Sequence, residues 1–367
     1  MNSEINQALR GENATALSAP KILEELVLQA EQAGASDIHL QMRGKVAEVA
    51  FRLDGVITPG AELSAEVAER VFGRIKFLAR LKTYQEMLPQ DGRIPHDELK
   101  CHNDLRVATY PTITGEKIVL RLFNSETAKT LGELSLPATA KAELETFLRQ
   151  TTGLMLLTGP AGSGKTTTIY ACLRHLAALG GRHIITVEDP VEQIVPGSMQ
   201  TEINEAIGLD FARAARHLLR QDPQVLILGE IRDEATAQLA VRAGLTGHLV
   251  ISTLHAGSCR GVFERLLAMC ADPSAVASAV ELVLNQRLIR KACFACDGAG
   301  CVSCLRTGYN GRVPLVEWLR VNEPLREQIR RRDVSTIGPL QTLAASARSL
   351  VNQGETNEAE FKRVFGL

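Results

Sequence analysis

The chain has few aromatic residues, almost no net charge and no long apolar run. Aromatic side chains make up 4 % of its 367 residues and the formal net charge is −1, so neither an aromatic stacking channel nor a basic surface for nucleic acid is expected. No apolar stretch approaches the roughly 18 residues that cross a bilayer, and the polar N-terminus has no signal-peptide core. We therefore expect a cytoplasmic protein that associates with membranes only through partners.

The eight cysteines do not have the pattern of a disulfide framework, which is rare in cytosolic proteins. Four of them lie within twelve residues, with the spacing C-x₂-C-x₄-C-x₂-C: Cys293, Cys296, Cys301 and Cys304. Two such pairs can present four thiolates tetrahedrally to Zn²⁺ in a closed, structural site. The sequence therefore predicts a zinc element, with a redox or iron–sulfur centre and unliganded thiols as the alternatives.

The most informative stretch, residues 159–166, reads GPAGSGKT and has the spacing of a phosphate-binding loop. An apolar run precedes it, as a buried strand would, and helical spacing follows it. Glycines let backbone N–H groups turn toward a polyphosphate at a helix N-terminus. Lys165 is then predicted to reach the β- and γ-phosphates, and the Thr166 hydroxyl to bind Mg²⁺. The predicted nucleotide-binding residues are Gly159, Pro160, Ala161, Gly162, Ser163, Gly164, Lys165, Thr166 and Thr167.

Apolar strands and helical patterns alternate around this loop. Strands are expected at 154–157, 183–187, 225–228 and 249–253, and helices at 166–179, 211–220 and 235–243. This order predicts an α/β domain with a mostly parallel sheet covered on both faces. A nucleotide would then bind at the carboxyl ends of the strands.

The region before residue 123 has a different pattern, which predicts a small α+β domain. Helical spacing occurs at 22–33 and 65–81, a hairpin signal at 54–55, and extended segments at 105–110 and 117–123. We divide the chain into a polar extension (1–18), the α+β domain (19–123), a linker (124–133), the α/β core (134–290), the tetracysteine element (291–312) and a helical C-terminal region (313–367).

Two carboxylates and two histidines stand at strand ends of the predicted core. Glu188 and Glu230 each follow an apolar run. An acid in that position beside a phosphate loop can hold Mg²⁺ or orient the attacking water; the alternative is a solvated strand-terminal acid. His248 and His255 flank the strand at 249–253, where a histidine can sense a γ-phosphate by hydrogen bonding or simply cap the strand.

The run RQDPQVLILGEIRD at 220–233, followed by LTGHLVISTLH at 245–255, resembles the secretion-ATPase superfamily. Within it, the chain is similar to the type II secretion and type IV pilus assembly ATPases (the GspE/PilB family) from about residue 22 onward. Other matching motifs are ASDIH (35–39), FRLDG (51–55), PQDGR (89–93), LRV (105–107), GEK (115–117), VEDPVE (187–192) and the tetracysteine segment. The resemblance implies a RecA-like P-loop core between a PAS-like N-terminal domain and the zinc element.

The resemblance also implies roles for single residues. Glu188 matches the acidic-box glutamate that activates the hydrolytic water, and Glu230 matches an atypical Walker B glutamate. His248 and His255 match the histidine box. The arginines that match family positions for γ-phosphate contact and subunit coupling are Arg52, Arg93, Arg106 and Arg265. The alternative for any one arginine is a surface ion pair.

The sequence departs from the family pattern in several places. Ala161 replaces a usual threonine, Leu88 a usual arginine, and 256–257 a common threonine–asparagine pair. The spacer between the cysteine pairs is only four residues, so we expect a minimal metal knuckle. The extra N-terminal domain with which many assembly ATPases dock is not recognised, so docking is expected through another surface, or else the chain belongs to a compact subfamily.

The function implied by the resemblance is that of a cytoplasmic, Mg²⁺-dependent ATPase working as a hexameric ring. ATP would bind between the N-terminal domain and the core, and hydrolysis would release the two domains. The motion would drive an inner-membrane platform protein of the secretion or pilus machinery and add pilin-like subunits to a filament. The tetracysteine favours assembly, with a retraction motor as runner-up. Two hypotheses from different functional classes stay open: a DNA-translocating or conjugation ATPase, and a non-catalytic scaffold that binds nucleotide.

Overall fold

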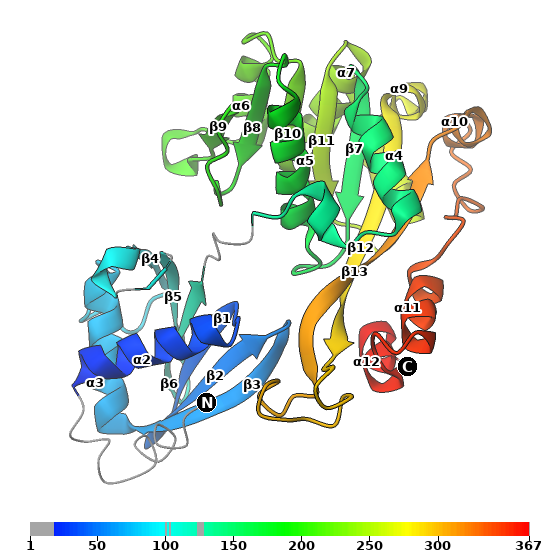
Figure 1. Cartoon of the computed structure of the whole chain (residues 1–367). Coiled ribbons are helices and arrows are strands. Elements are labelled where there is room, and N and C mark those ends of the chain that lie inside the picture. The colour runs from blue at the N-terminus through cyan, green and yellow to red at the C-terminus, as the bar shows by residue number, and fades with distance from the viewer. Residues whose placement is uncertain (1–17, 100, 103, 123–127, 367) are drawn as a thin grey trace. The chain divides into compact units, whose positions relative to one another are not determined.

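The computed structural model describes residues 18–99, 101–102, 104–122 and 128–366 (Figure 1). The polar extension predicted at the N-terminus, apart from its last residue, and part of the predicted linker lie outside these residues. The chain divides into two compact units: Met1–Thr127 with Cys293–Gly311, and Ala128–Ala292 with Arg312–Leu367. The contacts of the tetracysteine segment therefore group it with the N-terminal unit.

Among its described residues, the N-terminal unit has a six-stranded sheet in the order β3-β2-β1-β6-β5-β4 with two helices. Every described neighbouring pair in the sheet is antiparallel. The strands are β1 (Asp37–Arg43), β2 (Val46–Leu53), β3 (Val56–Ser64), β4 (Gln90–Ile94), β5 (Leu105–Thr112) and β6 (Gly115–Leu122), and the helices are α2 (Ala19–Gln32), α3 (Ala65–Leu78) and the 3₁₀ turn η2 (His96–Glu98). The apolar stripe of α2 packs with that of α3 and with alternate strand residues in one core, so both helices cover the same face of the sheet. The predicted α+β pattern is confirmed in this unit, including the hairpin between β2 and β3.

The second unit contains a seven-stranded sheet in the order β13-β12-β7-β11-β10-β8-β9. Its strands are β7 (Gly153–Thr158), β8 (Ile184–Glu188), β9 (Met199–Glu202), β10 (Val225–Ile231), β11 (Leu249–Leu254), β12 (Val280–Ala292) and β13 (Tyr309–Arg320). The described pairs from β12 through β9 are all parallel. A mostly parallel α/β sheet was the sequence prediction, and it is confirmed.

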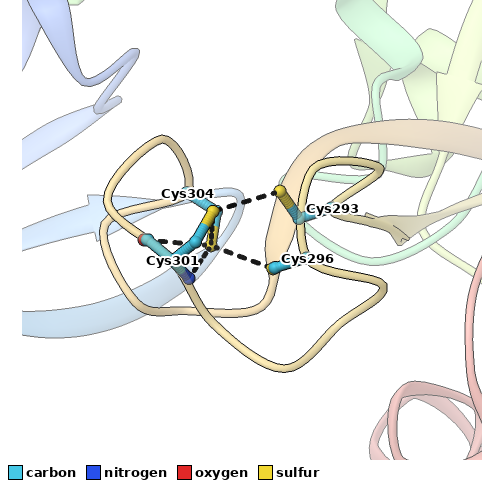
Figure 2. A group of neighbouring side chains, drawn as sticks. All are labelled: Cys293, Cys296, Cys301 and Cys304. Atoms are coloured by element: carbon cyan, nitrogen blue, oxygen red, sulfur yellow. Dashed lines mark hydrogen bonds between the residues drawn. The ribbon is translucent and has the colours of Figure 1, made fainter.

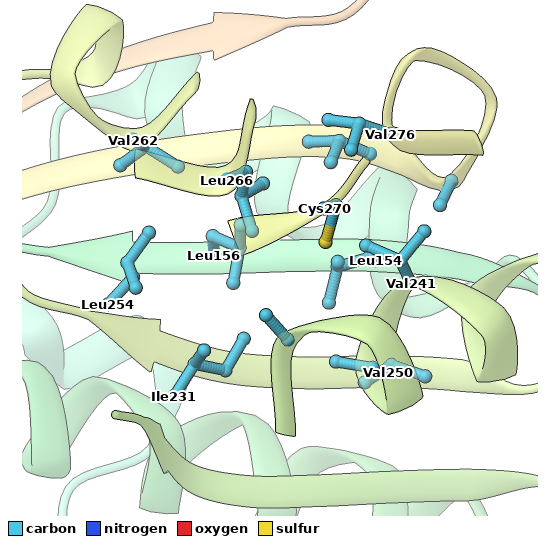
Figure 3. Packing of buried hydrophobic residues seen from close by; sticks show 14 of the residues in the cluster. Leu154, Leu156, Ile231, Val241, Val250, Leu254, Val262, Leu266, Cys270 and Val276 are labelled. Carbon is cyan, nitrogen blue, oxygen red and sulfur yellow. The ribbon is translucent and has the colours of Figure 1, made fainter. Parts of the chain in front are cut away.

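Helices cover both faces of this sheet because side chains of the buried strands alternate between two cores. On β7, Leu154 and Leu156 pack in one core, and Met155 and Leu157 in the other. Figure 3 shows part of the first core, which is closed by α6 (Phe211–Leu218), α7 (Glu234–Leu245), α8 (Cys259–Met269) and α9 (Pro273–Ala279). The second core is closed by α4 (Ala138–Leu148), α5 (Lys165–Leu179) and the 3₁₀ turn η3 (Leu131–Leu134), and a further 3₁₀ turn, η4 (Glu205–Ile207), lies elsewhere in the unit.

The C-terminal region differs from the sequence expectation, because it begins with a strand and not a helix. β13 extends to Arg320, and its two faces pack in different cores. Val316 lies in the second core, and its neighbour Leu315 lies in a separate small core. The sheet therefore continues past residue 290, the boundary expected for the core. The helices follow only then, as α10 (Glu323–Arg330), α11 (Leu343–Asn352) and α12 (Glu358–Phe365).

Candidate nucleotide site and metal centre

The phosphate loop lies between the end of β7 and the start of α5, as its sequence predicts. Gly159 and Gly164 have φ values of 136° and 88°, which residues with a side chain rarely adopt. A Cβ atom at Gly159 would lie 2.2 Å from the Gln286 backbone oxygen, and one at Gly164 would lie 2.7 Å from Gln286 Nε2. Both positions therefore require glycine, because β12 passes directly against the loop.

Gln286 of β12 holds the loop through both ends of its buried amide. Its Nε2 donates to the Ser163 carbonyl at 2.9 Å, and its Oε1 accepts from the Thr168 hydroxyl at 2.9 Å. Lys165 Nζ donates to the Gly159 carbonyl at 2.8 Å, and burial lowers the pKa of this amine. The Ser163 hydroxyl is buried without a partner among the described residues. A loop of this shape, with an amine and an unpaired hydroxyl, fits a polyphosphate.

Seven predicted site residues of the core meet around one cavity of about 260 Å³. It is lined by Ala161, Gly162, Lys165, Thr166, Ile169, Tyr170, Leu173, Glu188, Asp189, Pro190, Glu192, Phe211, Ile227, Gly229, Glu230, Thr253 and His255. The carboxyl ends of parallel strands share one edge of the sheet, which is why Glu188 at the end of β8 and Glu230 near the end of β10 approach the phosphate loop together.

Glu188 is 8 % exposed, and its two carboxylate oxygens are both hydrogen-bonded. Oε1 accepts from the Thr186 hydroxyl at 2.5 Å and from Gln200 Nε2 at 3.0 Å. Oε2 accepts from the Tyr170 hydroxyl. Burial raises the pKa of Tyr170, and this hydrogen bond raises it further. The carboxylate therefore has a fixed orientation at the cavity wall.

Glu230, which also lines the cavity, lies between the side chains of His255 and Arg232. Its Oε2 is 3.2 Å from His255 Nε2, and its Oε1 accepts from Arg232. Arg232 also lies 3.3 Å from Asp189. Burial lowers the pKa of His255, and the charge of Lys165 lowers it further. Neutral imidazole can donate one hydrogen bond and accept another, so His255 can pair with Glu230 without forming a fixed ion pair.

Outside the phosphate loop, two predicted residues of the core do not line this cavity. His248 precedes β11 and bonds the Ala243 carbonyl at 3.1 Å, so it stands at the amino end of the strand, opposite His255. Arg265 on α8 donates to the His255 carbonyl at 2.6 Å, so it contacts the backbone of this histidine and does not line the cavity. Only one residue of the predicted histidine box therefore reaches the cavity.

The arginines expected in the N-terminal unit form a row across its sheet. Arg93 opposes Arg106, and Arg106 opposes Arg121 on β6. Arg121 opposes Asp37, which in turn opposes Arg52. Directly opposed residues share a face, so four arginines and one aspartate lie side by side.

The single carboxylate within the row binds two of its arginines. Arg121 Nε lies 2.9 Å from Asp37 Oδ1, and Arg52 Nε lies 3.2 Å from Oδ2. Burial raises the pKa of Asp37, but the hydrogen bonds and charges, those of Arg121 foremost, outweigh it and lower the pKa overall. Arg93 pairs with Asp104 at 2.6 Å. The sequence reasoning missed Arg121; its position facing Arg106 across a hairpin was the signal that could have found it.

The four clustered cysteines lie in the loop between β12 and β13, and Figure 2 shows their side chains gathered around one point. All four sulfur atoms lie within 4.8 Å of one another. The distances are 3.9 Å for Cys293–Cys301, 3.8 Å for Cys296–Cys304 and 3.7 Å for Cys301–Cys304. Sulfurs bound tetrahedrally at about 2.3 Å from zinc lie about 3.8 Å apart. Hydrogen bonds to Ser303 and to the Cys304 backbone lower the pKa of Cys301 to about 6, whereas burial raises the pKa of Cys296 to about 11. The sulfur spacing, rather than these opposed shifts, is what fits a metal.

Known proteins resemble this chain along nearly its whole length. A family model described as "Type II/IV secretion system protein" matches residues 12–363. A protein transport protein HofB homolog of Haemophilus influenzae is 39 % identical over 349 residues, covering 94 % of this chain and 73 % of that protein. Type II secretion system protein HxcR of Pseudomonas aeruginosa is 37 % identical over 364 residues, covering 94 % and 76 %.

Solved structures share the fold. The pilus retraction motor PilT, crystallised with bound ADP, has a TM-score of 0.67 and 27 % identity over 95 % of this chain and 96 % of its own. The ATPase DotB of Legionella pneumophila has a TM-score of 0.72 over the same shares at 21 % identity, which shows the fold alone. Among the described residues, no helix is both long and apolar enough to cross a membrane.

Proposed function

Because the chain belongs to the type II/IV secretion family, among the type II secretion and type IV pilus assembly ATPases, we propose that it hydrolyses ATP with Mg²⁺ to drive filament assembly. The observation that carries the proposal is the cavity that joins Lys165, Thr166, Glu188 and Glu230 beside the phosphate loop. Two fixed carboxylates, an amine and a hydroxyl at the carboxyl edge of a parallel sheet are the groups that phosphoryl transfer to water requires.

Each group has a distinct role in this proposal. The loop amides and Lys165 bind the β- and γ-phosphates, and Thr166 and Glu230 would hold Mg²⁺. Mg²⁺ bound here would neutralise charge on the phosphate oxygens. Glu188 orients the attacking water and takes its proton. His255 reports on the γ-phosphate through its contact with Glu230.

The arginine row is the proposed link between hydrolysis and motion. Arginines that reach a γ-phosphate stabilise the charge of the transition state, an effect worth roughly 10³–10⁵ in rate. We assign this role to Arg93, Arg106 and Arg52, and add Arg121 because it lies in the same row. Loss of the γ-phosphate would release these side chains and let the N-terminal unit move.

The proposed setting is a hexameric ring at the cytoplasmic face of the inner membrane, held there by a platform protein of the secretion or pilus machinery. The cysteine cluster, with sulfur spacing that suits zinc, favours an assembly motor. A retraction motor is the second candidate, supported by the whole-length likeness to PilT. Complementation separates them, because loss of an assembly motor abolishes filaments, whereas loss of a retraction motor leaves them in excess.

The first test is phosphate release by the purified chain with Mg²⁺–ATP, alone and with the cytoplasmic part of its platform protein. Lys165→Ala and Glu188→Gln are each expected to lower turnover by at least about 10²-fold. Lys141→Ala on α4, at a residue that does not line the cavity and is paired with Glu145, is the matched control. Full turnover by Lys165→Ala would overturn the proposal, and nucleotide binding without any turnover would favour the non-catalytic scaffold.

A further inference from the structure

Tyr170 makes three hydrogen bonds through one buried hydroxyl. It lies on α5, five residues after Lys165, and is 4 % exposed. The hydroxyl oxygen accepts from the backbone N–H of Glu192 at 2.9 Å and of Gln193 at 3.2 Å. Backbone N–H groups can only donate, so the single phenolic proton is left for Glu188 Oε2. The backbone N–H groups of the loop after β8 therefore fix the direction of the hydrogen bond between Tyr170 and Glu188, in which Tyr170 donates.

Glu188 has one acceptor position left after its bonds are counted. An ionised carboxylate offers about four such positions. Thr186 and Gln200 fill those of Oε1, and Tyr170 fills one on Oε2. Both Glu188 and Tyr170 line the cavity beside the phosphate loop. The open position is therefore on Oε2, and the Tyr170 bond decides where the remaining lone pair of that oxygen lies.

We propose that Tyr170 is a positioning residue that holds the Glu188 carboxylate for proton transfer from the attacking water. As the water oxygen bonds to the γ-phosphorus, the bond from that phosphorus to the β–γ bridging oxygen breaks. ADP leaves with the electron pair, and Glu188 takes the water proton on its open position. The inference rests on the proposed function, in which Glu188 activates this water.

A purely structural role for the hydroxyl would be to hold the loop after β8. That loop has another anchor on the same helix, because Arg174 donates to Gln193 Oε1 at 2.8 Å. Among the described residues, Glu188 Oε2 accepts a hydrogen bond from Tyr170 alone. Removal of the hydroxyl should therefore disturb the carboxylate more than the loop, and Tyr170→Phe keeps the ring that packs in the core.

The test is steady-state hydrolysis of Mg²⁺–ATP by the full chain, with nucleotide affinity measured separately. Tyr170→Phe is expected to lower kcat by about 10–100-fold, as for a displaced catalytic group, with KM and affinity for ATP within about twofold. In the Glu188→Gln background the same change should have no further effect, because both act through one carboxylate. Tyr84→Phe, at an exposed tyrosine of the N-terminal unit, is the matched control.

The outcomes separate this inference from the function on which it rests. An active Glu188→Gln enzyme would refute the role of Glu188 and with it the proposed mechanism. An inactive Glu188→Gln beside a fully active Tyr170→Phe would overturn the inference alone, as would a loss confined to KM. If Tyr170→Phe does not fold, Thr186→Val removes a donor on the other oxygen. A fall in kcat at constant KM there supports the positioning network, and an unchanged kcat refutes it.

Discussion

Removal of metal from the cysteine cluster is expected to unfold residues 293–308 and to leave both sheets folded. Residues 293–304 contain no helix or strand. Phe294 is 103 % exposed and Val302 is 71 % exposed, so the loop buries little apolar surface. Ordering the sixteen residues of 293–308 costs roughly 19–32 kcal/mol at about 1.2–2 kcal/mol each. Something other than packing must offset that cost.

Zinc binding supplies most of the free energy that offsets this ordering cost. Four thiolates binding structural zinc contribute about 10–16 kcal/mol. Six backbone hydrogen bonds within 293–308, among them Arg306 to the Cys301 carbonyl at 2.7 Å, add about 1 kcal/mol each. The two contributions together, about 16–22 kcal/mol, overlap the lower part of the ordering cost, and neither is sufficient alone. The large cores of the two sheets contain none of the four cysteines, so they should not depend on the metal.

The assay is hydrogen exchange of the full chain before and after chelation, with zinc measured by mass spectrometry. One zinc per chain is expected, and chelation or Cys304→Ser should abolish protection of 293–308 only. Cys101→Ser is the control, because Cys101 is a buried thiol of the N-terminal unit outside the cluster. Unchanged loop protection in the zinc-free chain would refute this reasoning.

Three further predictions concern buried polar groups. Lys76 is 2 % exposed and lies 2.7 Å from Glu116. Lys76→Met alone should lower the free energy of unfolding by about 3–5 kcal/mol, and Lys76→Met combined with Glu116→Leu should recover most of that loss. Chemical denaturation measures the free energy of both variants. Gln286→Leu removes the hydrogen bonds that hold the phosphate loop and the start of α5. It should therefore raise the Kd for ATP by about tenfold while the melting temperature falls little. Equal Kd values for the variant and the unchanged chain would contradict this. Burial raises the pKa of Glu360, but hydrogen bonds from Arg363 and Arg290 outweigh it and lower the pKa overall. Its stabilising contribution is therefore present above the ordinary glutamate range and lost as pH falls through the lowered pKa, which unfolding curves of Glu360→Gln across pH would test.

The fold was largely readable from sequence because its signals are local. The phosphate loop needs only adjacent glycines and a lysine, and each buried strand of the core is a short apolar run. β12 was not recognised, because Asn285 and Gln286 interrupt its apolar pattern. Both are buried and bond other segments of the chain: Gln286 the phosphate loop, and Asn285 the Gly257 carbonyl at 3.2 Å. A polar residue whose partner lies far away along the chain leaves no periodic signal.

The same limit explains the residues missed around Glu188. Tyr170 lies at a helical position that is typical of a core residue, and Gln200 lies on an edge strand with no apolar pattern. Each becomes meaningful only when strand order brings β8 beside β9 and faces α5 toward the strand end. The N-terminal arginines were found by resemblance, whereas their arrangement in a row depends on the register of four strand pairs.

Strand direction, in contrast, was information that the sequence already contained. Once a parallel sheet is predicted, only the carboxyl end of each strand can face the phosphate loop. His248 and His255 bracket the six residues of β11, so they stand about 23 Å apart at roughly 3.3 Å per residue over seven steps. His255 follows the strand and reaches Glu230, whereas His248 precedes it and bonds the end of α7. Any effect of His248 on hydrolysis must therefore pass through α7 or β11, because its own side chain cannot reach a nucleotide bound at the loop.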